Sequence, residues 1–359
     1  MDQFEKKNEL LILNNSQALY KFRLLADLYI SIFFWSFNKN SCQPPLNNTH
    51  IIKILKSQDP KNLIDLSSIY MEKEKIKNNF HIFHWFLEFP DVFGRDQPGF
   101  DVILANPPWD TIQLDEREFF KTKCPEIAEI SKQNQRRLKI KSLKTENLDL
   151  HSQYSKMMLK TKKEVNFIKL SPFYRNSSHG NLTTYPMFIE RIANILAPNG
   201  FFSVICPTTF LLSDNLKEFV KLFIQNNALN SYFDFENKKI FPIDSRFHFL
   251  ITSGLNPFIK HPYQKILASF MQESPNRVLE LIQKKETITN SNDLFLFEPE
   301  DYTLFNPNTG NSPVFNSRLD YEILKRIYNK VPILLKKGQN SEINSYKINT
   351  TRIDRKSVV

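Results

Sequence analysis

Asn106, Pro107, Pro108 and Trp109 form the stretch of this chain whose residue types and spacing are best suited to chemistry. An exocyclic amino group of a nucleobase is a weak nucleophile, because its lone pair is delocalised into the ring. The Asn106 side-chain oxygen and the Pro107 carbonyl oxygen offer two acceptors for the hydrogens of such a group and would favour its attacking form. Trp109 offers a flat ring on which an extruded base can stack. The stretch therefore predicts a site for an extruded base, and the alternative is a rigid turn beside a core tryptophan.

The element that must position this stretch is the apolar run 100–105, which reads as a buried, central parallel strand. Pro107 and Pro108 end its pairing because neither has an N–H group to donate. The polar residues are then expected at the carboxyl end of a strand, where open α/β sheets bind their ligands.

The same four residues match the catalytic motif of amino-methyltransferases that act on DNA adenine and use S-adenosylmethionine. The resemblance extends to the large restriction–modification methylases of type IIG and covers roughly residues 20–335. It is carried by further segments at 83–93, 180–188, 234–242, 305–310 and 313–315.

This resemblance implies roles for three more residues. Phe241 precedes a proline in a segment whose aromatic residue contacts the flipped base in that family, and the alternative is a core phenylalanine. Tyr185 and Asn181 are expected to line the pocket or to brace the catalytic loop, although a helix cap with a packed tyrosine explains them equally well. Asp234 and Glu236 are assigned a structural role.

The resemblance also implies S-adenosylmethionine as the cofactor, which this family binds on a glycine-rich turn upstream of the catalytic motif. Before Asn106 the chain has only Gly94 and Gly99 and no Gly-x-Gly sequence. The cofactor-binding residues are therefore not identified. We expect a second polypeptide to supply the donor-binding half, as in the product of a split or decayed methylase gene.

Three functions remain open on this basis. The first is an adenine-specific DNA methyltransferase of a restriction–modification system, completed by another polypeptide. The second is a catalytically inactive fragment that retains DNA binding. The third is a methyltransferase for RNA or for a protein glutamine, which the lysine-rich insertion described below and the extended restriction-type similarity disfavour.

Composition agrees with a soluble globular protein that has an anionic partner. The 359 residues are 41% hydrophobic and 24% charged, and the net charge is +10. The cysteines and histidines show no spacing typical of a disulfide framework or a metal site, which fits the reducing cytoplasm. The apolar run 24–37 is too short to cross a bilayer, so no membrane is expected.

A basic stretch follows the catalytic motif. Between Arg117 and Lys169 the sequence has 14 Lys and Arg residues against 6 Asp and Glu residues, without strand alternation. It predicts a helical insertion at 115–170 that contacts the backbone of double-stranded DNA, and a solvated helical face is the alternative. The residues expected to contact DNA are Arg136, Arg137, Lys139 and Lys141.

The remaining pattern predicts an α/β fold: an incomplete Rossmann-like methyltransferase sheet with a helical N-terminal segment and the helical lysine-rich insertion. The expected domains are a helical segment at 1–82, a catalytic part at 83–256 and a segment at 257–359 that leads toward a target-recognition region. Expected helices lie at 8–38, 50–56, 66–80, 187–196 and 213–225. Expected strands after the insertion lie at 201–206, 229–235 and 247–252, with a glycine turn at 198–200, a packed connector at 83–93 and little regular structure beyond Pro257.

Overall fold

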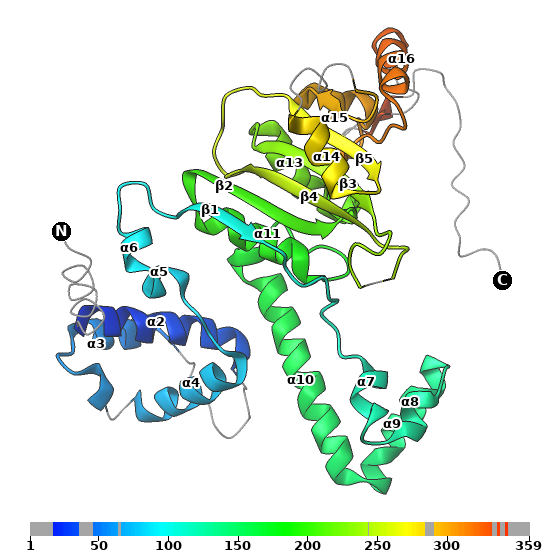
Figure 1. The fold of residues 1–359 in the computed structure, drawn as a ribbon. Coiled ribbons are helices and arrows are strands. Elements are labelled where there is room, and N and C mark those ends of the chain that lie inside the picture. The colour runs from blue at the N-terminus through cyan, green and yellow to red at the C-terminus, as the bar shows by residue number, and fades with distance from the viewer. Residues whose placement is uncertain are drawn as a thin grey trace. The chain divides into compact units, whose positions relative to one another are not determined.

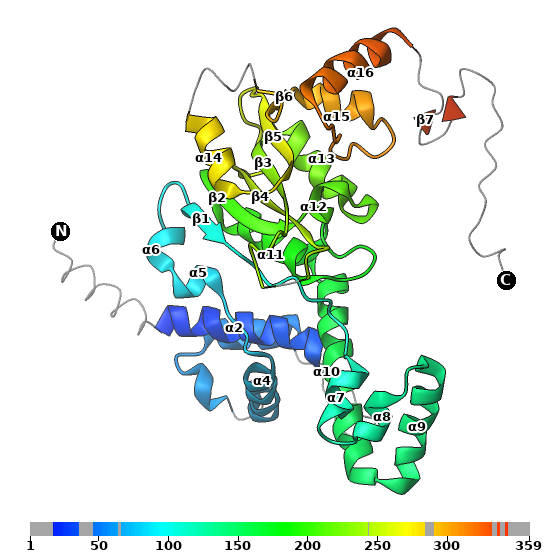
Figure 2. The same cartoon turned by 45° about the vertical axis from the view of Figure 1, so that its right-hand side comes forward.

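A computed structural model describes residues 17–35, 46–63, 66–242, 244–283 and 291–331, and the short strands at 336–337 and 342–343. The chain divides into two compact units. The first contains residues 1–99 and 110–184, and the second contains residues 100–109 and 185–359. Figures 1 and 2 show the elements of both units.

The first unit begins with helices. These are α2 (Gln17–Phe34), α3 (Asn48–Lys56), the 3-10 turn η1 (Pro60–Asn62), α4 (Ser67–Phe80), α5 (Trp85–Glu88) and α6 (Pro90–Phe93). Their common core contains Leu24, Leu28, Ile54, Ile69 and Ile76. The helices predicted at 50–56 and 66–80 are confirmed. Residues 8–16 and 36–38 of the first predicted helix lie outside the described residues, and the connector at 83–93 forms two short helices.

A buried carboxylate ties these helices together. Asp27 of α2 is only 2% exposed and accepts hydrogen bonds of 2.9 Å from both Lys77 and His84. Lys73 lies 3.7 Å from the same carboxylate. Burial alone would raise the pKa of Asp27, but the bonds from His84 and Lys77 outweigh it and hold the pKa below its ordinary value.

The insertion is helical, as predicted. It contains α7 (Glu116–Lys121), α8 (Pro125–Glu129), α9 (Gln133–Glu146), α10 (Leu148–Leu170) and η3 (Pro172–Tyr174). A small core of its own is built from Phe120, Ile127, Ile140, Leu143 and Leu150. The two ends of the insertion meet in an antiparallel bridge between Thr111 and Thr183, supported by a 2.9 Å bond from the Thr184 N–H to the Asp110 carbonyl.

The second unit is built on a mixed six-stranded sheet with the order β1-β2-β4-β3-β5-β6 (Figure 1). The strands are β1 (Phe100–Ala105), β2 (Leu196–Pro207), β3 (Leu229–Glu236), β4 (His248–Leu255), β5 (Ile266–Gln272) and β6 (Phe295–Phe297). The β1–β2 and β3–β5 pairs are parallel, and the other three pairs are antiparallel. The α/β class is thereby confirmed, and the strands expected at 229–235 and 247–252 are present as β3 and β4, which pair with each other.

Helices cover the sheet unevenly. The main core joins one face of the sheet to α11 (Thr184–Ile195), α12 (Thr209–Leu212), α13 (Lys217–Gln225) and α15 (Pro299–Phe305). On the opposite face, Val278 of α14 (Pro275–Gln283) packs on Phe235 and Phe249. α16 (Arg318–Lys330) lies beside α15 and β6, η4 (Asp214–Leu216) precedes α13, and β7 (Lys336–Lys337) pairs with β8 (Glu342–Ile343) (Figure 2).

Three predictions about the sheet were wrong. β1 is an outer strand with half of its residues exposed, because β2 is its only neighbour among the described strands. Gly200 lies inside β2 and does not form a turn; a Cβ there would meet the Phe100 carbonyl oxygen at 2.6 Å, so glycine permits the close approach of β1. Regular structure continues beyond Pro257, because β5 and β6 complete the sheet.

Candidate active site at the carboxyl edge of the sheet

The strand directions bring three loops of the second unit to one edge of the sheet. β1 and β2 are parallel and end at Ala105 and Pro207. β3 runs antiparallel to β4, with Glu236 opposite His248, so the end of β3 lies at the same edge. The loops that follow these strands therefore meet where α/β proteins bind ligands.

The predicted catalytic stretch occupies the first loop. Asn106 and Pro108 are exposed and Pro107 is buried, so the backbone is held while the asparagine amide faces solvent. Trp109 is half-buried against both the main core and the Phe235–Phe249 cluster. Its indole Nε1 is buried without a hydrogen-bond partner in the structure. The tryptophan thus has a packing role in addition to any stacking role.

The third loop presents Phe241. Its ring packs edge-on against Phe249, with the ring centroids 4.9 Å apart, and remains partly exposed. Asn237, which is 1% exposed, accepts a bond from the Phe241 N–H at 2.9 Å and donates one to the Phe241 carbonyl at 3.2 Å. Our sequence reasoning missed this role, although an asparagine four residues before the candidate aromatic residue was a usable signal.

The second loop contributes two threonines that sequence reasoning also missed. The Tyr185 hydroxyl lies 2.9 Å from Oγ1 of Thr209, and Tyr185 is only 5% exposed. Thr208 donates to the buried carboxylate of Asp234 at 2.5 Å, and the same carboxylate accepts the Met271 N–H at 3.1 Å. The geometry gives Tyr185 and Asp234 bracing contacts in this edge of the sheet.

The other predicted residues lie in the first unit. Asn181 is exposed next to the bridge that closes the insertion. Arg136 is 8% exposed and forms a 2.9 Å ion pair with Glu116, and Lys139 pairs with Glu146 at 2.8 Å. Arg137 and Lys141 are exposed on α9.

The residues at this edge do not fit the methyl donor. A donor cradle needs glycines where the backbone approaches the ligand, but all seven glycines of the chain lie outside the loops 106–109, 207–216 and 237–247. Gly200 and Gly254 lie near the opposite ends of the strands and serve close strand contacts; a Cβ at Gly254 would meet the Ala228 carbonyl oxygen at 2.3 Å. The three loops at this edge therefore do not provide the glycine cradle that S-adenosylmethionine requires.

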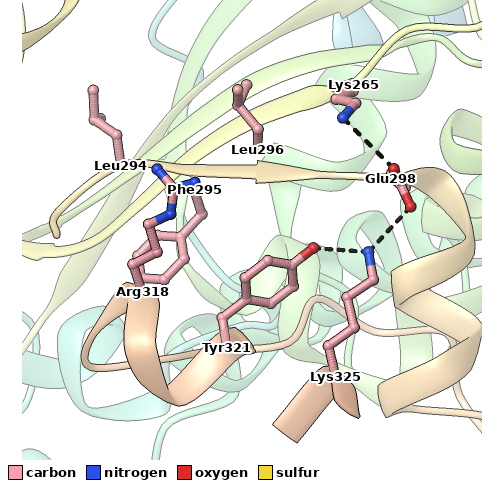
Figure 3. Close-up of a pocket in the computed structure, with 8 residues that line it drawn as sticks. All are labelled: Lys265, Leu294, Phe295, Leu296, Glu298, Arg318, Tyr321 and Lys325. Carbon is pink, nitrogen blue, oxygen red and sulfur yellow. Dashed lines mark hydrogen bonds and ion pairs between the residues drawn. The ribbon is translucent and has the colours of Figure 1, made fainter. Parts of the chain in front are cut away.

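A pocket of about 360 Å³ lies beside β6, at the other margin of the sheet (Figure 3). Its charged groups are already paired: Lys325 bonds to Glu298 at 3.0 Å and to Tyr321 at 3.0 Å, and Lys265 lies 3.6 Å from Glu298. Burial raises the pKa of Tyr321 to about 12. We interpret this pocket as a junction between helix and sheet.

The described residues hold no cluster of His, Cys, Asp or Glu side chains with the arrangement of a metal site. Among the same residues, no helix combines the length and the apolar character needed to span a membrane.

An α/β fold with Asn-Pro-Pro-Trp at the carboxyl edge of its sheet defines a methylase-type protein, and comparison with known families agrees. The family of Eco57I restriction-modification methylases matches residues 12–168 and 154–241, which is more than half of the 359 residues. The chain therefore belongs to the Eco57I restriction-modification methylase family, and the predicted resemblance to restriction–modification methylases is confirmed.

Solved structures of restriction enzymes are also similar. They include the type IIG restriction endonuclease BpuSI (16% identity over 39% of this chain, TM-score 0.28) and DrdV in complex with DNA (13% over 64%, TM-score 0.30). A third is a nuclease-deletion mutant of the type ISP enzyme LlaGI with a DNA substrate mimic (12% over 64%, TM-score 0.30). The matched regions cover 17%, 19% and 22% of those chains, so this chain spans about a fifth of their length. No curated protein matches the chain.

Proposed function

We propose that this chain is the base-binding part of an adenine-specific DNA methyltransferase of a restriction–modification system. The observation that carries the proposal is the exposed Asn106 on a buried Pro107 at the carboxyl edge of the sheet. S-adenosylmethionine is the expected methyl donor, held by a donor-binding part outside these residues. The sheet is on this view an incomplete Rossmann-like methyltransferase sheet.

The roles of the residues follow from their chemistry. The Asn106 oxygen and the Pro107 carbonyl oxygen accept the two amino hydrogens of an extruded adenine, which directs the nitrogen lone pair away from the ring. Phe241 offers a ring for base contact, and its backbone is held by Asn237. Trp109 supports the loop from the core side and presents its remaining exposed surface to the base.

Double-stranded DNA is the proposed partner. Arg137, Lys141 and Lys144 are exposed and recur at i, i+4 and i+7 on α9, so they share one helix face. The neighbouring stripe, Arg136, Ile140 and Leu143, is buried. A basic stripe of this kind suits the phosphate backbone, and Asn181 stays a candidate for bracing the catalytic loop.

A catalytically inactive DNA-binding fragment is the second candidate, and the lack of glycines at the carboxyl edge favours it. Measurements of base capture and of methyl transfer distinguish the methyltransferase from the inactive fragment. The full chain is mixed with duplex DNA that carries the fluorescent adenine analogue 2-aminopurine at a mismatch, which is easily extruded. A fluorescence increase that Trp109→Ala or Phe241→Ala reduces supports the proposed site, and no increase with the unmodified chain contradicts it.

Methyl transfer is tested by co-expressing the full chain with the donor-binding portion of a complete family member, in bacteria that lack adenine methylation. Digestion and mass analysis of the DNA should reveal N6-methyladenine. Asn106→Ala should lower it by about 10²–10³-fold, as expected for loss of one preorganised hydrogen-bond partner of the reacting group. Asn292→Ala, which changes an exposed asparagine near β6, is the matched control. Base capture without any methylation would favour the inactive fragment.

A further inference from the structure

The outer part of the insertion is a small helical unit with a short turn before its basic helix. α7, α8 and α9 pack around the start of α10 through the core that contains Phe120 (Figure 2). α8 ends at Glu129 and α9 begins at Gln133, so three residues join the two helices. Helix-turn-helix units that bind DNA use a turn of this length, and their second helix enters the major groove.

Two arginines fix this turn. The Arg136 side chain of α9 donates to the Ile130 carbonyl at 2.9 Å. The Arg117 side chain of α7 donates to the Ser131 carbonyl at 3.1 Å. Arg136 is itself held by its 2.9 Å ion pair with Glu116. The direction in which α9 leaves the turn is therefore set within the insertion.

α9 also presents a face that its own packing does not use. Its three buried residues all lie on one stripe of the helix. By helical spacing Asn134 and Leu138 lie opposite that stripe, with Gln135 beside them. All three are exposed, and Leu138 is 69% exposed. The helix carries five Lys and Arg residues and a single acidic residue, so its surroundings favour an anionic partner.

The side chains on this face are those that read base edges. An asparagine or glutamine amide can bond to both N6 and N7 of adenine in the major groove, and an apolar side chain can contact the thymine methyl group. Arg137 and Lys141, on the flank of the same face, suit the phosphates. α9 has 14 residues, which is about 21 Å of helix, and a major groove about 12 Å wide admits such a helix.

We propose that α9 enters the major groove of duplex DNA and reads an A·T base pair through Asn134, Gln135 and Leu138. The inference rests on the DNA partner of the proposed function. The extruded adenine of that function is held by the Asn106 loop, so α9 reads a different base pair. The insertion then contributes to the choice of sequence as well as to affinity.

The test uses the full chain and duplex DNA, without methyl transfer. Selection from a random duplex library should enrich a sequence with a defined adenine. Fluorescence anisotropy should show that the chain binds it about tenfold more tightly than a scrambled duplex. Asn134→Ala with Gln135→Ala should nearly abolish this preference and leave binding to the scrambled duplex almost unchanged. Asn78→Ala with Asn79→Ala, at two exposed amides of α4, is the matched control and should keep the preference.

A modified base shows whether the contact lies in the major groove. Replacing the selected adenine with 7-deazaadenine removes the N7 acceptor and leaves the Watson–Crick pair intact. The unmodified chain should lose about tenfold in affinity for this duplex. The Asn134, Gln135 double variant, which already lacks the contact, should show almost no further loss. Thermal unfolding of both double variants should match that of the unmodified chain, because the changed side chains are exposed.

Three outcomes would overturn the inference: equal binding to all duplexes, a preference that survives loss of the α9 amides or of N7, or tighter binding to duplex RNA, whose narrow major groove excludes a helix. The 2-aminopurine measurement reports base capture separately. A preference that depends on α9, without base capture, would refute the proposed function and leave this inference standing. Base capture without any preference would do the reverse.

Discussion

The side chain of Asn237 holds the backbone of Phe241 from both sides, accepting from its N–H at 2.9 Å and donating to its carbonyl at 3.2 Å. A third contact joins the same amide to the Asp244 carbonyl at 3.4 Å. One buried amide therefore fixes the loop that carries the candidate base-contacting ring.

Asn237→Ala should lower the free energy of unfolding by about 2 kcal/mol, because it leaves buried backbone groups without partners. It should also speed hydrogen exchange at residues 238–242 and weaken base capture by the 2-aminopurine measurement. Asn237→Asp keeps the acceptor for the Phe241 N–H. Its stability and base capture should lie between those of Asn237→Ala and those of the unmodified chain. Base capture that is unchanged in Asn237→Ala would show that the loop does not position Phe241.

Two substitutions at Trp109 separate packing from base contact. Trp109→Ala should cost about 2 kcal/mol of folding free energy, since the half-buried ring supports two clusters. Trp109→Phe retains an aromatic ring and removes a buried N–H that has no partner in the structure, so its stability should equal or exceed that of the unmodified chain. Chemical denaturation measures both. A large loss of stability in Trp109→Phe would show that the indole N–H is needed for folding.

The basic stripe on α9 should make DNA binding depend on salt. Changing Arg137, Lys141 and Lys144 to Glu should reduce affinity and flatten the log–log salt dependence, which has a slope of about −0.9 per phosphate contact. Lys53, Lys56 and Lys75, which are exposed on α3 and α4, make a control with the same change of net charge when altered to Glu. Equal effects of the two triple variants would contradict a specific role for α9.

Arg136 should behave differently from its neighbours on α9. Its ion pair with Glu116 and its 2.9 Å bond to the Ile130 carbonyl lie within the insertion's own packing. Arg136→Glu places two carboxylates together in a buried position and should unfold the insertion. Limited proteolysis would then cut within residues 115–170, whereas Arg137→Glu should leave that region resistant.

The buried carboxylate of Asp27, with its partners Lys77 and His84, should make the stability of the chain depend on pH. The pKa of Asp27 is lowered in the folded chain, so its contribution is fully present above the ordinary aspartate pKa of about 4. The contribution is lost as the pH falls through the lower folded-state value. Asp27→Asn should cost about 3 kcal/mol at neutral pH and flatten the acid decline in a urea-unfolding series. Asp91→Asn, at an exposed acid, is the control that should change neither.

Much of the local structure could be predicted from the sequence. An apolar periodicity or a boundary residue in the sequence indicates several elements that the structure contains. These are the strand before Asn106, the helices near 50–56 and 66–80, and the strands at 229–235 and 247–252. The role proposed for the Asn106 loop rests on its residue types and on the family resemblance, so this candidate site could be named from the sequence and stays a prediction.

Other features depend on contacts between distant segments of the chain, which short-range sequence patterns do not specify. An apolar run reads as buried, but only the strand order reveals that Leu104 faces solvent. Gly200 resembles a turn residue in the sequence. In the structure a glycine is needed there because the Phe100 carbonyl, from a distant part of the sequence, lies too close for a side chain. Regular structure after Pro257 depends on pairing of β5 with β3, which short-range periodicity does not show.

The bridge between Thr111 and Thr183 brings the two ends of residues 110–184 side by side. The chain leaves the sheet-bearing unit after Trp109 and returns to it at Tyr185, so residues 110–184 join that unit through two adjacent backbone segments. The outer part of this segment, from α7 to the start of α10, has a core of its own around Phe120, whereas Phe167 near the end of α10 packs on Phe34 of α2. Lengthening residues 110–184 would cost little additional loop-closure entropy, because the two ends of the segment stay joined. A longer insertion would therefore extend the proposed DNA-binding surface on α9 while Asn106 stays at the end of β1.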